Sequence, residues 1–352
     1  MNKKALSVIM AGALAVCSAG CANKTSPSGD VKTLTNGNYY VSEKGEAVKY
    51  NSLYFDFLGG KDVMPIGGFY GVYNSGGTID GLEIPQMVSD KYFGLISDAG
   101  VNMVVYSRDE DPATVKRTLE LGEKHGIGLF ANVNSITAFC GRQDDASKRY
   151  TAGGKMPFGV AEMTDYISAF AAYDSFLGIK GADEPFWYQL DALQATYDVL
   201  REVGYGNTEL YVNSLGYGGG DLTYGGWEEN ITQEQYFNKI YGEIKVPFLS
   251  ATGYFYTQKD TPDSELSIMF TQLSQIRSLA NKYGVPMWRM LQAGGQWNDA
   301  AQEIESVDPY PDEGELLFDV NIALCYGCKA IQYFPLVEPV HFAYAPGGTY
   351  DF

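Results

Sequence analysis

Two adjacent carboxylic acids are the residues of this sequence best suited to chemistry. Asp183 and Glu184 stand in "GIKGADEPFW", directly after an apolar run of the kind that forms a buried strand. A charge beside a buried strand is costly unless it is paired or used, so this position is a candidate functional site. Such carboxyl groups can move a proton to or from a substrate. A salt bridge, or a cap for a helix after Trp187, is the alternative reading and stays open.

The elements that would position these acids form a regular alternation of strand and helix. Short apolar runs are each followed by a stretch with helical periodicity, as in successive βα units. The eight runs are 64–71, 101–107, 127–133, 176–182, 209–214, 248–255, 286–292 and 329–334. Strands that are apolar throughout, rather than alternating, indicate a parallel sheet covered by helices. Eight repeats favour an α/β fold closed into a (β/α)8 TIM barrel.

The ends of this barrel have their own sequence signals. Pro112 and Gly126 are typical of the first and last turns of one of the predicted helices. We expect the barrel to occupy residues 59–352 and a short β-hairpin to precede it in residues 31–58. The sequence stops soon after the eighth strand, so residues for an eighth helix are missing. This predicts either a C-terminally incomplete chain or another element on that side.

Barrel enzymes place their reacting groups at the C-terminal ends of the strands. Residues that lie within or just after the predicted runs and could contact a substrate are Tyr70, Tyr106, Asn132, Asn134, Asn213, Tyr254, Tyr256, Trp288, Gln292 and Trp297. Flat rings for stacking and amides for hydroxyl groups suit a neutral polar ligand such as a carbohydrate. Each of these residues alone is equally consistent with a core or loop position, so the prediction depends on the set.

The Asp-Glu-Pro at the end of the fourth predicted strand resembles the [Asn/Asp]-Glu-Pro of clan A glycoside hydrolases. The runs "MPIGGFYG" and "ALCYGCKAIQYF" also look like the first and eighth strands of β-galactosidase-like barrels. This resemblance spans about residues 60–340, and its sharpest motif is three residues long. It implies that Glu184 is the general acid/base and that Asp183 contacts the sugar 2-hydroxyl.

A glycosidase also needs a second carboxylate, about 5–5.5 Å away as a nucleophile or roughly 6.5–9.5 Å away as a base. In the resembling family this is a Glu that ends the seventh strand. Here the matching residue is Gln292, whose amide cannot be the nucleophile. Two substitutes follow other strands: Glu338, and the run from Asp109 to Asp111. We favour Glu338 as the second catalytic residue, because an isolated acid amid apolar residues is the less ordinary placement, with a surface-loop position as its open alternative. The acidic run suits the cap of a helix at Pro112.

The first residues predict export. Lys3 and Lys4 precede an uncharged apolar run, and the sequence Ser-Ala-Gly ends at Cys21. This order is that of a secretory signal peptide, and it resembles the lipobox of bacterial lipoproteins. We expect residues 1–20 to be the lipoprotein signal peptide, Cys21 to be lipidated, and residues 21–30 to be a flexible tether. The predicted location is extracytoplasmic, with the protein anchored in the bacterial envelope or cell surface.

Composition narrows the classes of ligand. The net charge is −18 and no basic cluster follows the signal, which disfavours nucleic acid. Only two histidines occur, and Cys325 and Cys328 lie in an apolar setting, so we predict no metal and no cofactor. The 27 tyrosines suit stacking on sugar rings, although most are expected in the core.

Two functions remain from the sequence. The first is a cell-surface glycoside hydrolase that cleaves O-glycosidic bonds of a neutral glycan, with Glu184 as the acid. The second is an inactive barrel lipoprotein that captures sugars, which Gln292 favours. The fold alone does not choose between them. The oligomeric state stays open.

Overall fold

The computed structural model divides the chain into two units, Met1–Asn51 and Ser52–Phe352. The residues described are 39–41, 47–49, 55–69, 71–72, 77–79, 82–84, 86–105, 111–143, 145–203, 209–218, 220–255, 263–294, 297–298, 303–304 and 311–336. In the first unit, β1 (Tyr39–Val41) pairs antiparallel with β2 (Ala47–Lys49), with Tyr40 opposite Val48. The short hairpin expected before the barrel is therefore present.

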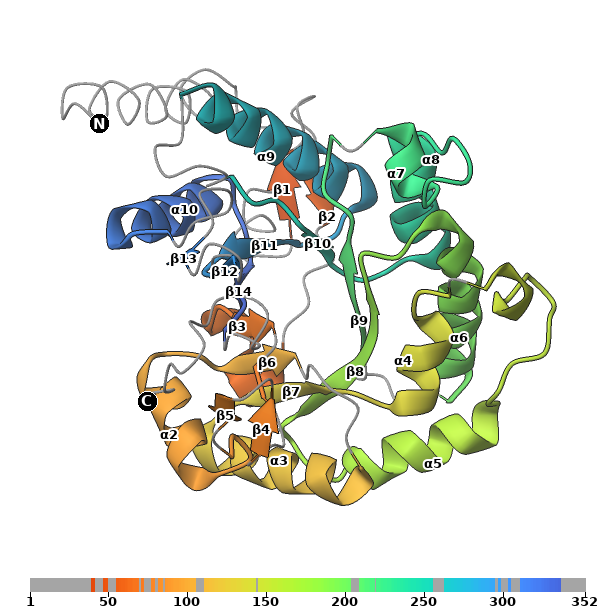
Figure 1. Ribbon diagram of the computed structural model, residues 1–352, viewed down its shortest axis with the longest axis vertical. Coiled ribbons are helices and arrows are strands. Elements are labelled where there is room, and N and C mark those ends of the chain that lie inside the picture. Colours follow the sequence, from red (N-terminus) through yellow and green to blue (C-terminus); the bar gives the residue numbers. More distant parts are fainter. Residues whose placement is uncertain are drawn as a thin grey trace. The chain divides into compact units, whose positions relative to one another are not determined.

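The second unit contains a closed barrel of eight parallel strands, visible as the ring in Figure 1. The strands in chain order are β3 (Ile66–Phe69), β6 (Met103–Val105), β7 (Gly128–Ala131), β8 (Phe176–Asp183), β9 (Glu209–Ser214), β10 (Leu249–Ala251), β11 (Met287–Gln292) and β14 (Ala330–Phe334). Seven of them lie within the predicted runs, and β8 extends one residue beyond its run, to Asp183. The ring closes where β14 pairs with β3, with Ile331 opposite Ile66. The predicted (β/α)8 barrel is confirmed.

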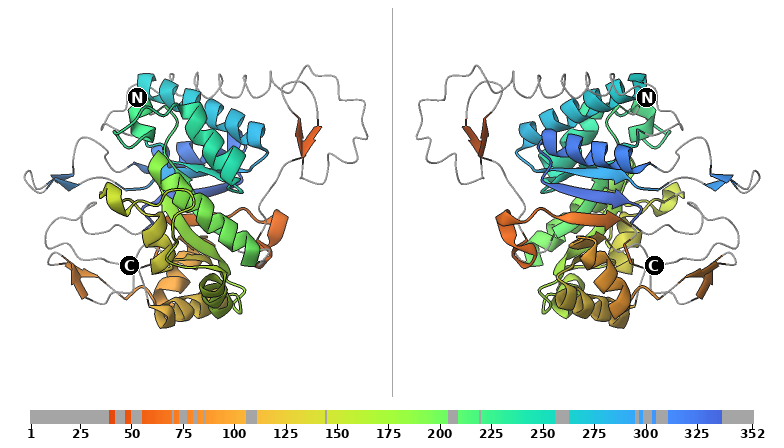
Figure 2. Two further views of the ribbon diagram at one scale, coloured as in Figure 1. Left: turned by 90° about the vertical axis from the view of Figure 1, so that its right-hand side faces the viewer. Right: turned by 90° about the vertical axis from the view of Figure 1, so that its left-hand side faces the viewer.

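Helices connect the strands and cover the outside of the barrel, as Figures 1 and 2 show. The α-helices are α2 (Asp90–Asp98), α3 (Pro112–His125), α4 (Asn134–Cys140), α5 (Val160–Phe170), α6 (Leu190–Val203), α7 (Asp221–Tyr224), α8 (Gln233–Phe237), α9 (Asp263–Tyr283) and α10 (Glu313–Cys325). The π-helix η6 (Asn238–Ile244) continues α8. Short 3₁₀ turns are η2 (Asp56–Leu58), η3 (Gly60–Asp62), η4 (Ala146–Lys148) and η5 (Trp187–Gln189). None of the described helices has the length and apolar character needed to cross a bilayer.

Two small hairpins interrupt the alternation. The strands β4 (Gly77–Ile79) and β5 (Leu82–Ile84) pair with each other in the segment between β3 and α2. The strands β12 (Trp297–Asn298) and β13 (Glu303–Ile304) pair in the segment between β11 and α10. Both hairpins therefore lie in βα connections, which are the segments that carry function in barrels of this kind.

Helix α3 begins and ends as its sequence predicts. The Asp111 carboxylate accepts hydrogen bonds from the backbone N–H groups of Ala113 and Thr114, at 2.9 and 3.1 Å. Pro112 occupies the first turn, and Gly126 ends the helix at φ 70°. Asp111 is therefore an N-cap, as expected for the acidic run, while Asp109 and Glu110 lie outside the described residues.

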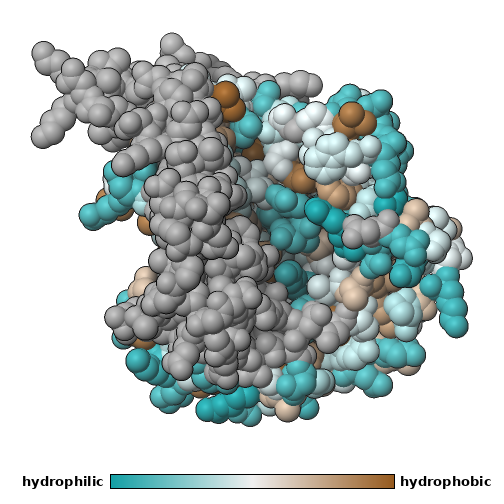
Figure 3. Space-filling model, viewed as in Figure 1, coloured by the Kyte–Doolittle hydropathy of each residue, from teal (hydrophilic) through white to brown (hydrophobic). Residues whose placement is uncertain are grey.

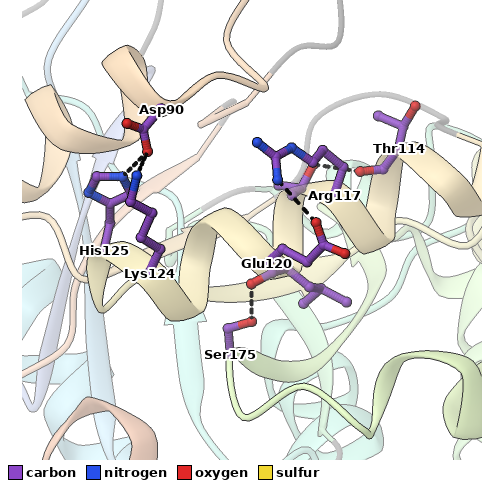
Figure 4. A network of polar contacts seen from close by, with 9 residues as sticks. Asp90, Thr114, Arg117, Glu120, Lys124, His125 and Ser175 are labelled. Carbon is purple, nitrogen blue, oxygen red and sulfur yellow. Dashed lines mark hydrogen bonds and ion pairs between the residues drawn. The ribbon is translucent and has the colours of Figure 1, made fainter.

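One of the two histidines serves to join helices. The ring of His125, at the end of α3, lies 2.9 Å from the Asp90 carboxylate at the start of α2, and Lys124 makes an ion pair with the same group (Figure 4). On the inner side of α3, the Ser175 hydroxyl donates to the backbone oxygen of Leu119 at 2.7 Å. These contacts fix α3 against its neighbours and leave His125 a structural role.

The barrel interior has an apolar floor and a polar upper layer. The rings of Phe130, Tyr211, Phe248 and Trp288 fill the lower part, where Phe248 and Trp288 stack at a centroid distance of 4.0 Å. Alternate residues of a strand point to the same side. Two residues further along four of the barrel strands, the inward positions are polar: Asn132, Asn213, Ser250 and Gln332. On β11 the matching residue is the apolar Met290, and the polar Gln292 follows two residues later. TIM barrels usually fill such layers with branched apolar side chains, so this polar layer indicates a site.

Candidate functional site

The candidate site lies at the carboxyl ends of β8, β9 and β10, around the predicted pair of acids. In Figure 3, the coloured surface near the centre of the view into the barrel is hydrophilic. The neighbouring strands place residues near their carboxyl ends side by side, with Asp183 opposite Asn213 and Asn213 opposite Ser250. Three strands that are far apart in sequence thus bring their polar ends together.

Glu184 is the first residue beyond β8, and its backbone has the left-handed conformation at φ 45°. Its N–H donates to the backbone oxygen of Asn213 at 2.7 Å, which holds this conformation in place. Non-glycine residues rarely adopt positive φ, and such strain is common at functional sites. The half-buried side chain accepts a hydrogen bond from Thr252.

Burial raises the pKa of Glu184 above its ordinary value, and the negative charge of Asp183 acts in the same direction. The Thr252 hydrogen bond and the positive charge of Arg142 oppose this effect. A carboxyl group with a raised pKa keeps its proton closer to neutral pH. Glu184 therefore has the property that a general acid requires.

Asp183 is accessible to solvent, yet its pKa is also raised, because the protein around it removes part of its hydration. Lys180, a hydrogen bond from Asn213 and Arg142 oppose this shift. Accessibility together with partial desolvation is expected of a side chain in a hollow that opens to solvent. Asp183 is thus available to contact a ligand at the mouth of the barrel.

Asn213 connects the two acids to the polar layer. Its side-chain Nδ2 donates to Asp183 Oδ1 at 3.1 Å and to Thr252 Oγ1 at 2.8 Å, while its Oδ1 accepts from Ser250 at 2.8 Å. Only 1% of Asn213 is exposed. The amide therefore uses its hydrogen-bonding capacity within the protein, and it positions Asp183 and Thr252 rather than a sugar.

The network continues across the barrel below the site. Ser250 accepts from Gln332 Nε2 at 3.3 Å, and Gln332 Oε1 in turn accepts from the Tyr211 hydroxyl at 2.7 Å. All three residues are fully buried. A satisfied buried network fixes its members in one arrangement, so the acids at the strand ends rest on a rigid polar platform.

Two cations lie close to the acids. Lys180 is 9% exposed, and its Nζ lies 5.0 Å from the centroid of the Phe69 ring. Arg142, after α4, is exposed and places its guanidinium 4.2 Å from the centroid of the Phe186 ring. The sequence has no basic cluster after the signal, so only the fold brings these charges together.

Tyr254 is the predicted aromatic residue that the structure brings to the acids. Its ring stacks on Phe334 at 5.4 Å, and its hydroxyl lies 3.5 Å from the Met290 sulfur. Burial raises the pKa of Tyr254 well above its ordinary value, and the negative charges of Asp183 and Glu184 raise it further. A phenol with such a pKa stays protonated and is suited to donating a hydrogen bond.

Three other predicted residues have buried positions. Trp288 is 2% exposed in the apolar floor, below the polar layer. Asn132 is 3% exposed, and its side-chain oxygen accepts from the Thr137 hydroxyl. Gln292 ends β11 as predicted, and it is 3% exposed. These residues were predicted to contact a substrate, and the structure packs all three among protein groups.

The other predicted residues lie outside what the structure describes. Tyr70, Tyr106, Tyr256, Glu338 and Cys21 are not among the described residues, and for Asn134 and Trp297 only the backbone is described. The eighth helix and the C-terminal residues also fall outside the described ranges.

Sequence reasoning missed Thr252, Lys180 and Arg142. Thr252 is a polar residue inside the predicted run 248–255, which was a signal, and the structure places it directly after β10. Lys180 interrupts an apolar strand, which is a second signal. Arg142 had none, because it lies nine residues beyond Val133, where its strand run ends. Among the described residues, no three His, Cys, Asp or Glu side chains gather as a metal site, and Cys325 and Cys328 are free thiols.

Comparisons with known proteins add structural neighbours at low similarity. No family model and no curated protein matches the sequence. A β-glucuronidase from Ruminococcus gnavus has a TM-score of 0.48 at 8% identity, covering 82% of this chain and 46% of its own. An endoglucanase from Pseudomonas stutzeri has 0.44 at 13%, covering 77% and 85%, and an endo-alpha-mannosidase from Bacteroides thetaiotaomicron has 0.44 at 12%, covering 74% and 70%.

All three neighbours are named as glycosidases. This chain spans about half the length of the glucuronidase that it matches. The similarities are too low to assign residues or activity, so the barrel itself rests on the strand pairing described above.

Proposed function

We propose that this protein is a glycoside hydrolase that cleaves O-glycosidic bonds of a neutral glycan, with Glu184 as the general acid/base. The observation that carries the proposal is the Glu184 carboxyl, which has a raised pKa, a strained backbone and a place at the strand ends of a TM barrel. An acid that keeps its proton can protonate the leaving oxygen of a glycoside. In the same step Asp183 binds the sugar and Tyr254 donates a hydrogen bond.

The second carboxylate of the reaction is assigned to Glu338, which follows β14. In a closed barrel β14 is the neighbour of β11, whose last residue, Gln292, cannot itself be the nucleophile. A carboxylate supplied from the adjacent strand end would approach the sugar from a similar direction. This assignment is part of the proposal and depends on residues beyond those described.

The protein is proposed to act outside the cytoplasm, held by a lipid on Cys21. The support is the order of basic, apolar and small residues before that cysteine. Metabolic labelling with a tritiated fatty acid tests this: the label should be lost in the C21S variant. Labelling that persists in C21S would contradict the anchor.

A second candidate function is capture of sugars without cleavage. One specific observation favours it: the residue that ends β11 is a buried amide, Gln292. The site would then bind a glycan for a neighbouring protein, and Glu184 would only donate a hydrogen bond to it. The two functions predict opposite results for hydrolysis.

The experiment is to measure hydrolysis by purified protein over a panel of aryl glycosides and oligosaccharides, with E184Q beside wild type. We expect E184Q to lower kcat about 10²–10⁴-fold, as for loss of a general acid. The control E202Q removes an exposed carboxyl from the surface of α6 and should match wild type. Equal rates for E184Q and wild type would eliminate the role of Glu184, and a complete lack of hydrolysis with retained binding would favour capture.

A further inference from the structure

Trp227 is an exposed tryptophan on a strained but well-defined backbone. It follows α7 in the connection after β9, and 66% of it is exposed, the largest fraction among the described large hydrophobic residues. Its backbone is left-handed at φ 64°, and its N–H donates to the Leu222 oxygen at 2.7 Å. Tryptophan is usually well buried. Packing in the core therefore does not explain why a tryptophan occupies this exposed position with a positive φ.

The indole is joined to the candidate site through Phe186. The two rings meet edge to face with centroids 5.5 Å apart, and Phe186 is the second residue after Glu184. A side chain on Gly226 would come within 3.1 Å of the Phe186 ring, so the turn before Trp227 is packed against it. The backbone oxygen of Pro185 accepts from the Tyr236 hydroxyl at 2.8 Å. Trp227 is thus held close to the proposed acid.

Arg142 contacts the same phenylalanine. Its guanidinium lies 4.2 Å from the Phe186 centroid, and its charge acts on both Asp183 and Glu184. The group is exposed, and within the described part of the chain it has no hydrogen bond or ion pair to another side chain. Its donors are therefore available to a ligand. Phe186 thus contacts both the exposed indole of Trp227 and the guanidinium of Arg142, whose N–H donors are available to a ligand.

We propose that Trp227 and Arg142, held by Phe186, form a subsite for a further sugar unit next to the one that Asp183 and Glu184 bind. One face of a pyranose would lie on the indole, and the guanidinium would donate to its hydroxyl groups. This inference deepens the proposed function, on which it rests. It makes the ligand an oligosaccharide or polysaccharide rather than a single sugar. The strained turn keeps the indole presented before the ligand arrives, which lowers the entropy lost on binding.

The test measures binding separately from cleavage. In an E184Q background, calorimetry compares cellotetraose, laminaritetraose and mannotetraose with glucose and mannose. We expect one of the tetrasaccharides to bind more tightly than its monosaccharide, and W227A to weaken its binding about tenfold. W227F, which keeps a ring, should recover part of this loss. The control L317A removes an exposed apolar side chain from α10 and should bind as the parent does.

Each outcome has one meaning. If no tetrasaccharide binds more tightly than its monosaccharide, or if W227A binds it as tightly as the parent, the subsite is wrong. If W227A does not fold, the test uses the E184Q protein itself. We then expect a bound tetrasaccharide to protect its tryptophan fluorescence from quenching by iodide. Absence of that protection also overturns the subsite. Wild-type protein that binds with this length dependence but hydrolyses nothing contradicts the proposed function and leaves the subsite standing.

Discussion

At the scale of single residues, the site depends on the balance of four charges. Asp183 and Glu184 are both partly desolvated, and Lys180 and Arg142 act on one or both of them. If Glu184 keeps its proton, the site holds one negative charge on Asp183 and two positive charges on Lys180 and Arg142, which leaves one positive charge in excess. This local balance differs from the charge of the whole chain, which is −18. Burial is the largest cause of the raised pKa of Glu184, and the charges of Asp183 and Arg142 adjust that pKa in opposite directions.

Replacing Arg142 should move the pH dependence of the reaction. The Arg142 charge lowers the pKa of Glu184, so R142Q should raise that pKa. A general acid works while protonated, and the basic limb of the kcat/KM profile reports its loss of the proton. We therefore expect this limb to shift to higher pH in R142Q. R142K keeps the charge and should leave the limb close to that of wild type. A shift to lower pH in R142Q would contradict the proposed role of Glu184.

At the scale of elements, a buried ion pair joins the seventh strand to the helix that follows it. Arg289 of β11 lies 3.2 Å from the Asp319 carboxylate of α10, and both side chains are almost fully buried. The same guanidinium donates to the Gly253 oxygen at 2.8 Å and lies over the Phe255 ring. Because Thr252 and Tyr254 flank Gly253, this pair also supports the segment that faces Glu184.

Breaking that pair should destabilise the protein strongly. D319A leaves the Arg289 charge buried without its partner, and we expect a loss of about 3–5 kcal/mol in the free energy of unfolding. Urea denaturation measures it. The matched control is D198A, which removes an exposed ion pair with Arg201 on α6 and should cost less than about 1 kcal/mol. Equal losses in the free energy of unfolding for D319A and D198A would show that the buried charge of Arg289 does not need Asp319 as its partner.

At the scale of the whole molecule, a buried acid links stability to pH. Glu209 begins β9, at the opposite end of the barrel from the site, and burial raises its pKa to about 7, although Arg201 opposes this. In the unfolded chain an ordinary Glu releases its proton near pH 4.5. Between these two values the folded state binds more protons than the unfolded state. Stability must therefore fall as pH rises through this window.

The change is expected to be on the order of 3 kcal/mol between pH 4.5 and 7, from about 1.4 kcal/mol for each unit of pKa. Urea denaturation at a series of pH values measures it. E209Q removes the titrating group, so its stability should vary less over the same range and exceed that of wild type at pH 7. E202Q, on an exposed site, should keep the wild-type slope. Parallel curves for E209Q and wild type would exclude Glu209 as the cause.

The order of elements was readable in the sequence, because it is encoded locally. Apolar runs of strand length recur eight times, separated by stretches of helical periodicity such as α3, which ends at Gly126. The resulting prediction of a closed barrel is confirmed. The place of Asp183 and Glu184 at the end of the fourth strand follows from the same local pattern. The capping role of Asp111 was also predictable, since Pro112 follows it.

What the tertiary structure decided is which of these polar residues face one another and which are buried. An apolar run does not reveal at which depth of the barrel each inward side chain lies, so Trp288 was expected at a ligand and lies in the floor of the barrel. Asn213 meets Asp183 across 30 residues of chain, and Trp227 reaches Phe186 across 41, because β8 and β9 pair side by side in parallel. Such contacts depend on register and ring closure, which no local pattern contains.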